Sequence, residues 1–496
     1  MTNEFWNAVV PRTFSGLSVL VLLISVEPLQ AASPSARAPV KPAAPAEWTM
    51  PAQNYESTRF SPLDEINTQN VAELKESWSF DLGTDRGAEA APLIVGTTMY
   101  MVTPYPNALF ALDLSQPHGD RVLKWKYEPK PVPASQEVAC CEVVNRGACY
   151  ADGRVFMNTL DGHTIAVDAA TGREIWNTQV ANIQIGETIT MAPSVASGKV
   201  LVGISGGEMG VRGWLKGLDP ASGLVLWSAV DGAAWGRVSY DPHLNLIYGV
   251  AAAGNEATEL DSGNNGLKSG AFALNPDTGH ARWFHPWSPA LEFEPGRVNE
   301  NILVDLPLNR GIRQVLLHTE RNGYVYVVDR ATGQKISATA IARGASSSNH
   351  QPAAYSPRTQ LLYIPYENLA NDVPFLALNA GMSPAPAPSR DVNHGGFTAW
   401  DPVAKKAVWT LKERFPIGSG TLVTGGDVVF YGTVNGKFNA VNAHTGKVLW
   451  TWTAKSGIIG QPVTYRGPDR KQYVAIQSGS GGGSEKSETL HVFSLR

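Results

Sequence analysis

A repeat of about 50 residues that ends in tryptophan constrains the fold of this chain more than any other feature. Two clear copies read "IAVDAATGREIW" and "FNAVNAHTGKVLW". Four copies are clear and four are weaker, and together they end at Trp78, Trp125, Trp176, Trp227, Trp283, Ser337, Trp409 and Trp450. The spacing from Trp125 to Trp176 is 51 residues, and it is the same from Trp176 to Trp227.

Each copy reads as a strand, a turn of the form Asp/Asn-x-x-Thr-Gly, and a second strand that carries the tryptophan. Further strands such as "KVLVGIS" and "DVVFYGT" precede it. A period of about 40–50 residues that contains four short strands is typical of a propeller blade. We therefore predict an all-β fold, an eight-bladed β-propeller over residues 48–496 whose tryptophans dock onto the neighbouring blade.

The N-terminus has the order of a secretory signal peptide. Arg12 precedes an apolar run at residues 17–26, and the small residues Ala31 and Ala32 follow. The run is short for a membrane span, although a retained anchor is the alternative. We predict a signal peptide at residues 1–32, a Pro/Ala-rich linker at residues 33–47, and a periplasmic protein that is not integral to the membrane.

Composition excludes several classes of protein. The formal net charge is −4 on 496 residues, without a run of like charge, so no nucleic-acid footprint is present. The motif Cys-x-x-Cys-His does not occur, which argues against a covalently attached haem domain.

The chain has only three cysteines, and two of them, Cys140 and Cys141, are adjacent. Neighbouring Cα atoms lie about 3.8 Å apart, whereas an ordinary disulfide prefers about 5.5–6 Å. From the residues alone, three interpretations stay open: a strained disulfide ring, two buried thiols, or one redox-active thiol beside a bystander. Export to an oxidising compartment favours the ring, and would leave Cys149 as a buried thiol.

Polar and small residues gather in loops, most of them directly before a strand. They are Glu89, Cys140, Cys141, Arg146, Thr190, Ser205, Gly206, Gly207, Glu208, Trp235, Asn255, Glu294, Arg321 and Asn349. Since they stand at corresponding points of their blades, they could converge at the mouth of the central channel. Taken singly, each also fits a turn residue or a surface charge, and the fold alone does not name the chemistry.

The chain resembles the quinoprotein alcohol dehydrogenases, periplasmic eight-bladed propellers that use pyrroloquinoline quinone (PQQ). The resemblance covers nearly all of residues 48–496, and its most specific motifs are "ACCEVVNRG", "SGGEMGVRG" and "RNGYVYVVDR". In that family the adjacent cysteines form a disulfide against one face of the cofactor, and a tryptophan covers the other. The resemblance thus implies a Cys140–Cys141 bond, with Trp235 opposite it.

The resemblance also implies roles for the other loop residues. Arg146, Thr190 and Ser205 would hold the carboxylates of PQQ, and Arg321 would polarise the quinone oxygen. Glu294 would be the general base, and Ca²⁺ would be bound by oxygen ligands. The implied metal ligands are Glu208, Asn255 and Glu294. The implied cofactor-binding set is Glu89, Cys140, Cys141, Arg146, Thr190, Ser205, Gly206, Gly207, Glu208, Trp235, Arg321 and Asn349.

Several positions depart from the family pattern. Glu294 replaces the usual aspartate, which moves the acid by about one methylene. Gly296 stands where lanthanide-using members carry a second aspartate, and this favours calcium. Asn255 matches the usual asparagine ligand only if two residues are inserted before it.

Two further departures concern the mouth of the site. Only "SAVDGAA" separates Trp227 from Trp235, where relatives carry a long excursion, and the tryptophan expected near Gly418 is absent. Both changes predict a wider mouth. We therefore expect oxidation of an alcohol bulkier than methanol to an aldehyde or ketone, with electrons passed to a separate cytochrome c or quinone. The alternatives are a degenerate PQQ-binding propeller and a non-catalytic scaffold.

Overall fold

The computed structural model describes residues 47–116, 122–139, 143–206, 211, 213–230, 238–251, 269–287, 299–308, 311–320, 322–341, 346–347, 351–367, 393–479 and 488–495. Internal packing divides the chain into two units, Met1–Lys41 and Pro42–Arg496. The strands that the structure describes all lie in the second unit.

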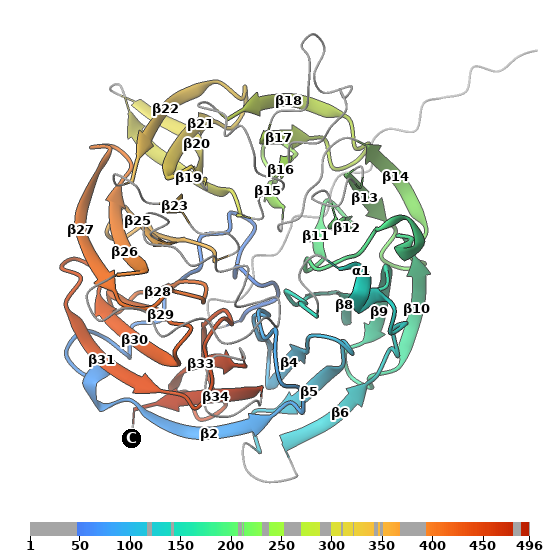
Figure 1. The fold of residues 1–496 in the computed structure, drawn as a ribbon, viewed down its shortest axis with the longest axis horizontal. Coiled ribbons are helices and arrows are strands. Elements are labelled where there is room, and N and C mark those ends of the chain that lie inside the picture. The colour runs from blue at the N-terminus through green and yellow to red at the C-terminus, as the bar shows by residue number, and fades with distance from the viewer. Residues whose placement is uncertain are drawn as a thin grey trace, which may run out of the picture. The chain divides into compact units, whose positions relative to one another are not determined.

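Eight sheets stand as blades around a common centre (Figure 1), so the predicted eight-bladed β-propeller is confirmed. Their strand pairs are antiparallel, except that β1 joins β28 in parallel. The first four blades, each given from its innermost strand outward, are β3 (Leu93–Val95), β4 (Thr98–Val102), β5 (Leu109–Asp113) and β6 (Leu123–Tyr127); β7 (Ala148–Ala151), β8 (Arg154–Asn158), β9 (His163–Asp168) and β10 (Glu174–Gln179); β11 (Ser194–Ala196), β12 (Lys199–Gly203), β13 (Trp214–Leu218) and β14 (Val225–Val230); and β15 (Ser239–Asp241), β16 (Leu246–Ala251), β17 (Gly270–Leu274) and β18 (Ala281–Pro286).

The other four blades continue the ring in chain order. They are β19 (Ile302–Leu308), β20 (Gly311–Thr319), β21 (Tyr324–Asp329) and β22 (Lys335–Ala340); β23 (Ser346–Ser347) with β24 (Ala354–Ser356), β25 (Leu361–Glu367), β26 (Gly395–Asp401) and β27 (Lys406–Glu413); β1 (Phe60–Ser61), β28 (Leu422–Thr424), β29 (Val428–Gly432), β30 (Lys437–Asn442) and β31 (Val448–Thr453); and β32 (Val463–Arg466), β33 (Gln472–Ser478), β34 (Thr489–Ser494) and β2 (Lys75–Asp81). Among the residues that the structure describes, three short helices lie outside the sheets: η1 (Val71–Glu73), α1 (Ser135–Val138) and η3 (Ile183–Ile185).

The two ends of the propeller are joined in one blade. β2, from the start of the propeller, pairs antiparallel with β34, from its end, with Trp78 opposite Val492. The last blade therefore forms only when both ends of the chain are in place.

The predicted docking of the tryptophans is confirmed, and Trp176 shows how it works. Its indole Nε1 donates to the carbonyl of Pro220 in the next blade at 3.0 Å. The ring packs on Gly223, whose φ is +73° and whose added Cβ would lie 2.6 Å from the ring. The equivalent indole bonds are Trp125 to Ala169, Trp227 to Pro276, Trp283 to Arg330, Trp409 to Ala443 and Trp450 to Leu74.

The turn at the end of each clear repeat presents such a glycine to the tryptophan of the preceding blade: Gly223 meets Trp176, and Gly172 meets Trp125. In the blade of Trp176, one carboxylate oxygen of Asp168 accepts bonds from the backbone and the hydroxyl of Thr171, at 2.8 and 2.7 Å. These bonds, that of the Thr171 hydroxyl first, lower the pKa of Asp168. The last turn residue, Gly172, has a φ of +74°, a left-handed conformation that glycine adopts at least cost. The repeat motif thus has one structural role: its turn has a fixed geometry and contacts the indole of the preceding blade.

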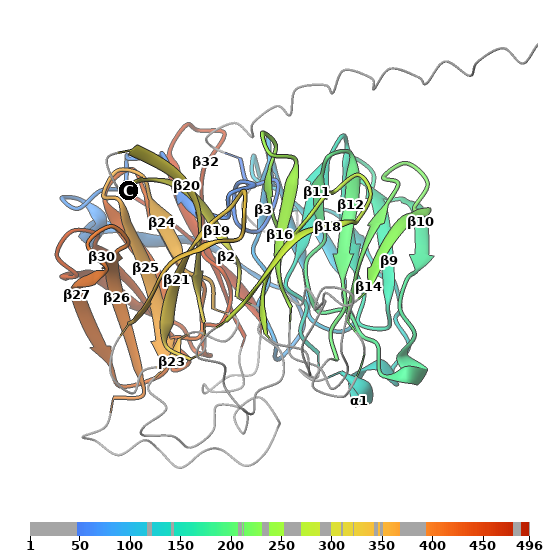
Figure 2. The ribbon, with the colours of Figure 1, turned by 90° about the horizontal axis from the view of Figure 1, so that it is seen from above.

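The main strands of each blade alternate in direction, so the chain leaves a blade at the end where it entered. The innermost strands of all blades therefore begin at one end of the propeller and end at the other. We name the end at which they begin the front face, and the other the back face. α1, which precedes β7, lies at the front face (Figure 2).

Residues 48–61, here named the central segment, run through the middle of the ring, where the blue trace lies in Figure 1. The segment exchanges backbone hydrogen bonds with the innermost strands of successive blades. Those bonds, of 2.7–3.1 Å, join Ile94 to Trp48, Tyr150 to Thr49, Tyr240 to Tyr55, Leu303 to Glu56, Tyr355 to Thr58, Val423 to Arg59 and Gly425 to Ser61.

Candidate functional site

Four of the predicted site residues meet at the front face, from three neighbouring blades. Glu89, Arg146 and Thr190 stand shortly before the innermost strands β3, β7 and β11. Ser205 follows β12, which ends at the same face because it is antiparallel to β11. The position before an innermost strand, from which Glu89, Arg146 and Thr190 were predicted, therefore also brings these three residues together.

Their side chains form one connected chain of polar contacts. Arg146 Nε lies 2.9 Å from Glu89 Oε2. Arg146 Nη1 donates to Thr190 Oγ1 at 2.8 Å. The hydroxyls of Thr190 and Ser205 are 2.6 Å apart. Glu89, Thr190 and Ser205 are each at most 4% exposed, so this chain lies inside the protein.

Backbone bonds hold the same residues in register. Arg146 N donates to Thr190 O at 3.0 Å, and Ser205 N donates to Thr188 O at 2.8 Å. Thr190 N also donates to Ser205 Oγ at 3.3 Å. When Ser205 Oγ in turn donates to Thr190 Oγ1, the Thr190 hydroxyl hydrogen remains available to an incoming acceptor.

This arrangement fits a carboxylate-bearing ligand. A guanidinium is the side chain best suited to a carboxylate, and here Glu89 fixes its orientation. Burying such an ion pair contributes little to stability, because desolvation offsets the attraction. Two buried hydroxyls beside the guanidinium supply further polar partners. The residues present thus fit the planar tricarboxylate that the sequence resemblance implies.

Gly206 follows Ser205 and is the fifth predicted site residue that the structure describes. Its φ is +108°, and an added Cβ would lie 2.7 Å from the carbonyl oxygen of Gly186. Only glycine fits at this position without a shift of the backbone.

The remaining predicted site residues lie outside the described residues. They are Cys140, Cys141, Gly207, Glu208, Trp235, Asn255, Glu294, Arg321 and Asn349. Among the residues that the structure describes, no group of three or more His, Cys, Asp or Glu side chains could hold a metal ion. Cys149 lies buried in β7 and packs with Met50 and Phe156.

A second buried polar group includes two residues that shortly precede the predicted Arg321 in the sequence. His318 Nε2 is 3.3 Å from Glu320 Oε2, and both side chains are buried. The ring of Trp287 stacks on His318, with centroids 4.6 Å apart and planes 7° apart. Sequence reasoning did not single out these three residues, because a histidine within a strand reads as a core residue.

Sequence reasoning also missed three polar residues at the centre: Arg59 and Gln461, which are buried, and Glu300, which is 10% exposed. One signal could have found Gln461. It precedes a proline at the start of an innermost strand, as Ala91 and Gln351 do in other blades. Arg59 and Glu300 do not precede a proline at the start of a strand, so this signal does not find them.

The stretch around Gly418 is packed. An added Cβ on Gly418 would lie 2.8 Å from Ile459 Cγ2 and 2.9 Å from Val434 Cγ1, and Ser419 is fully buried. Gly418 thus leaves no space at its own position. The predicted widening of the mouth rests on the short segment after Trp227, of which residues 231–237 lie outside the described part of the chain.

Within the part of the chain described by the structure, no helix is both long and apolar enough to cross a membrane.

Comparison with known proteins points to one family. The chain matches the family described as "PQQ: Glucose/ethanol/alcohol dehydrogenase, beta-propeller domain" over residues 48–229, 226–365 and 391–474. It is 39% identical to the lanthanide-dependent methanol dehydrogenase of Methylacidiphilum fumariolicum, over 88% of this chain and 85% of that protein. It is 31% identical to methanol dehydrogenase (cytochrome c) subunit 1 of Paracoccus denitrificans, over 88% of this chain and 84% of that protein.

A solved structure agrees with these relatives. The europium-containing methanol dehydrogenase superposes with a TM-score of 0.80 at 34% identity. The match covers 91% of this chain and 99% of that chain.

Proposed function

Because the chain belongs to the PQQ-dependent alcohol dehydrogenase family of propellers, we propose that it oxidises an alcohol to an aldehyde or ketone in the periplasm. The enzyme class, an oxidoreductase of this family, follows from the relatives. The observation that carries the proposed site is the buried chain from Glu89 through Arg146 and Thr190 to Ser205.

In this proposal Arg146, Thr190 and Ser205 bind the carboxylates of PQQ. Arg146 contributes charge, and its orientation is fixed by Glu89 on one side and Thr190 on the other. Both hydroxyls are buried, so the contacts they make with a ligand are shielded from water. The Cys140–Cys141 bond and Trp235 would cover the two faces of the ring, as the resemblance implies.

When bound, PQQ supplies an ortho-quinone that takes up two electrons from the alcohol. Glu294 accepts the hydroxyl proton of the alcohol as its C–H bond breaks. Arg321 would donate hydrogen bonds to the quinone oxygen and polarise it. Glu294 has one methylene more than aspartate, so its reach sets which alcohols are well placed.

For the metal we propose Ca²⁺, bound by Glu208, Asn255 and Glu294. The reason is Gly296, which removes the additional carboxylate that would favour a trivalent ion. The names of two relatives, lanthanide-dependent and europium-containing, point the other way. Reconstitution of the metal-free protein with calcium and, separately, with lanthanum decides between them. We expect calcium to restore activity and lanthanum to add little; strict lanthanide dependence would show that the ligand set is misplaced.

For the substrate we propose an alcohol bulkier than methanol. The shortened segment after Trp227 leaves a small alcohol less buried, and apolar burial contributes only about 0.8 kcal/mol per CH₂. The names of these two relatives favour methanol as the substrate, so the proposal and the names predict different results. A side-by-side panel of primary and secondary alcohols tests it, and methanol with the highest kcat/KM would contradict it.

For the electron acceptor we propose a separate cytochrome c or a quinone. The name of the Paracoccus relative associates a cytochrome c with that protein.

For the N-terminus we propose a signal peptide at residues 1–32 and a linker at residues 33–47, followed by the propeller at residues 48–496.

The experiment that tests the whole proposal is dye reduction by purified protein loaded with PQQ and a metal. Turnover of any alcohol supports the dehydrogenase. PQQ binding without turnover would instead favour a degenerate propeller, for which the altered residues Glu294 and Asn255 give a reason. No PQQ binding would contradict the proposed function and favour a scaffold.

A further inference from the structure

We propose that Gln461 and Arg59 are positioning residues, which set Glu89 and therefore Arg146 for binding of the cofactor carboxylates. The proposal rests on the proposed function, because it concerns the same PQQ site. Neither residue is part of the predicted set. Both lie at the centre of the ring, where the central segment meets the loops of the front face.

Gln461 joins the two parts of the molecule. Its Nε2 donates to the backbone carbonyl of Glu89 at 3.2 Å, and its Oε1 accepts from Arg59 Nη2 at 2.7 Å. The side chain is buried, and it packs against Gly420. Glu89 lies in a loop, and the bond to its carbonyl restrains the backbone from which its carboxylate extends.

Arg59 is in turn held on two sides. Its Nη1 and Nη2 donate to Glu300 Oε2 and Oε1, at 3.0 and 2.9 Å. This forked pair fixes the plane of the guanidinium, which a lysine could not do. The backbone of Arg59 is also fixed, because its carbonyl accepts from Val423 N at 3.1 Å. Arg59 is 2% exposed.

The contacts therefore form a continuous path across the centre of the ring. It runs from Glu300 through Arg59 and Gln461 to Glu89, and from there to Arg146. Glu300 lies six positions after Glu294, the proposed base. The path thus connects the segment that carries the base with the cluster proposed to hold the cofactor.

Stability alone is a poor reason for this path. A buried guanidinium–carboxylate pair contributes little net stability, and apolar side chains would fill the channel at least as well. Directional bonds do something that apolar packing cannot, which is to fix the orientation of a neighbouring polar group. We infer that the path is retained to orient Glu89.

Gln461→Met tests this inference. Methionine has a similar length and can keep the packing against Gly420, but it makes neither hydrogen bond. The matched control is Gln472→Met in the same blade. Gln472 is also buried and also makes two side-chain bonds, accepting from Ile66 N at 2.8 Å and donating to Thr464 Oγ1 at 2.9 Å. It does not touch the path to Glu89.

The readouts are the Kd for PQQ, from fluorescence titration of the metal-loaded apoprotein, and the Tm. We expect both variants to lower the Tm by similar amounts. We expect Gln461→Met to raise the Kd by about tenfold, the effect of one poorly placed charged contact. Gln472→Met should leave the Kd within about twofold of wild type.

A Kd that changes equally in both variants, or in neither, would overturn the inference and leave the proposed function intact. A wild-type protein that binds no PQQ would overturn both. In the event that Gln461→Met does not fold, Gln461→Asn keeps both functional groups but shortens their reach. The inference then requires a raised Kd for Gln461→Asn, and an unchanged one overturns it.

Discussion

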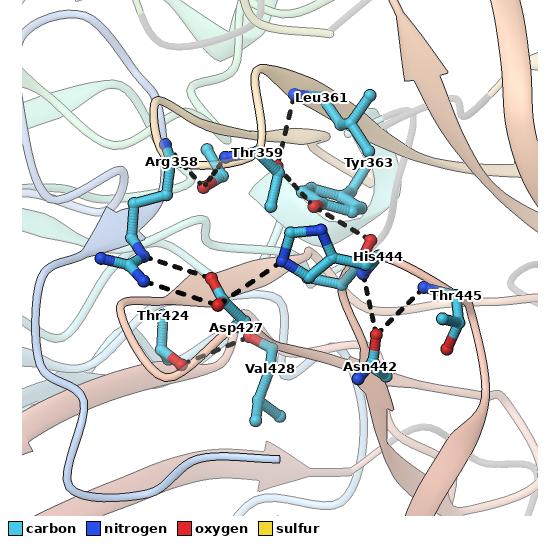
Figure 3. Close-up of polar contacts among 12 residues, drawn as sticks. Arg358, Thr359, Leu361, Tyr363, Thr424, Asp427, Val428, Asn442, His444 and Thr445 are labelled. Carbon is cyan, nitrogen blue, oxygen red and sulfur yellow. Dashed lines mark hydrogen bonds and ion pairs between the residues drawn. The ribbon is translucent and has the colours of Figure 1, made fainter.

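The propeller contains guanidinium–carboxylate contacts at its centre and at its back face, and the two places differ in what surrounds them. At the centre, Arg59 and Glu300 are 2% and 10% exposed and joined by two bonds of about 3 Å. At the back face, Arg358 Nε and Nη2 lie 3.2 and 3.5 Å from the carboxylate of Asp427 (Figure 3). Arg358 is 55% exposed.

His444 completes the back-face group, its Nε2 3.5 Å from Asp427 Oδ2 (Figure 3). The three residues come from three turns: between β24 and β25, between β28 and β29, and between β30 and β31. They therefore link two adjacent blades. Water screens such a pair and competes for its donors, whereas at the centre each lost partner leaves a buried charge. The comparison predicts that similar substitutions have very different effects at the two places.

The largest effect is expected at Arg59. Arg59→Met leaves the Glu300 carboxylate buried without its guanidinium, which should cost about 3–5 kcal/mol of unfolding free energy. Chemical denaturation measures it. The double variant Arg59→Met/Glu300→Met is the control, because it removes both charges and should recover much of the loss. A single variant within about 1 kcal/mol of wild type would contradict the account of a buried pair.

The next effect concerns binding rather than stability. Arg146→Lys keeps the charge but cannot contact Glu89 and Thr190 together in the geometry of the guanidinium. We expect the Kd for PQQ to rise by about 10- to 100-fold. Arg173→Lys, in an exposed turn, is the control and should leave the Kd unchanged. Equal Kd values for the two variants would remove Arg146 from the proposed site.

A smaller effect is expected where the blades dock. Gly223→Ala places a Cβ 2.6 Å from the ring of Trp176 at a φ of +73°. Gly198→Ala separates the two causes, because Gly198 has a φ of +68° and nothing within 4 Å of an added Cβ. We expect about 1 kcal/mol of destabilisation from backbone strain in Gly198→Ala, and about 1–3 kcal/mol more in Gly223→Ala. Equal losses would show that the indole contact does not hold the blades together.

The smallest effect is expected at the back face. Asp427→Asn removes the charge that links Arg358 and His444, and it should change the unfolding free energy by less than about 1 kcal/mol. Raising the salt concentration should reduce even this difference. A loss comparable to that of Arg59→Met would mean that exposure does not decide the strength of these pairs.

The parts of the molecule differ in how far their structure could be predicted from the sequence. The blades were predictable because tryptophan, turn and glycine recur at one spacing, and each local device carries its own geometry. Glu89, Arg146 and Thr190 could be singled out because each precedes an innermost strand, and strand starts meet at one face. Their hydrogen bonds to one another fit that reasoning.

The path through Arg59 could not be predicted in the same way. Arg59 meets Glu300 and Gln461 across separations of 241 and 402 residues, and these meetings depend on closure of the whole ring. Gly418 shows the converse case. A missing tryptophan suggested open space, but Ile459 and Val434 fill it, and this packing has no local signal in the sequence.

The most direct test of the central claim is a crystal structure of the protein with PQQ and its metal. We expect a PQQ carboxylate within about 3 Å of Arg146 and of the Thr190 or Ser205 hydroxyl, with Arg146 still paired to Glu89. PQQ bound elsewhere, or bound at the front face without a contact to Arg146, would contradict it.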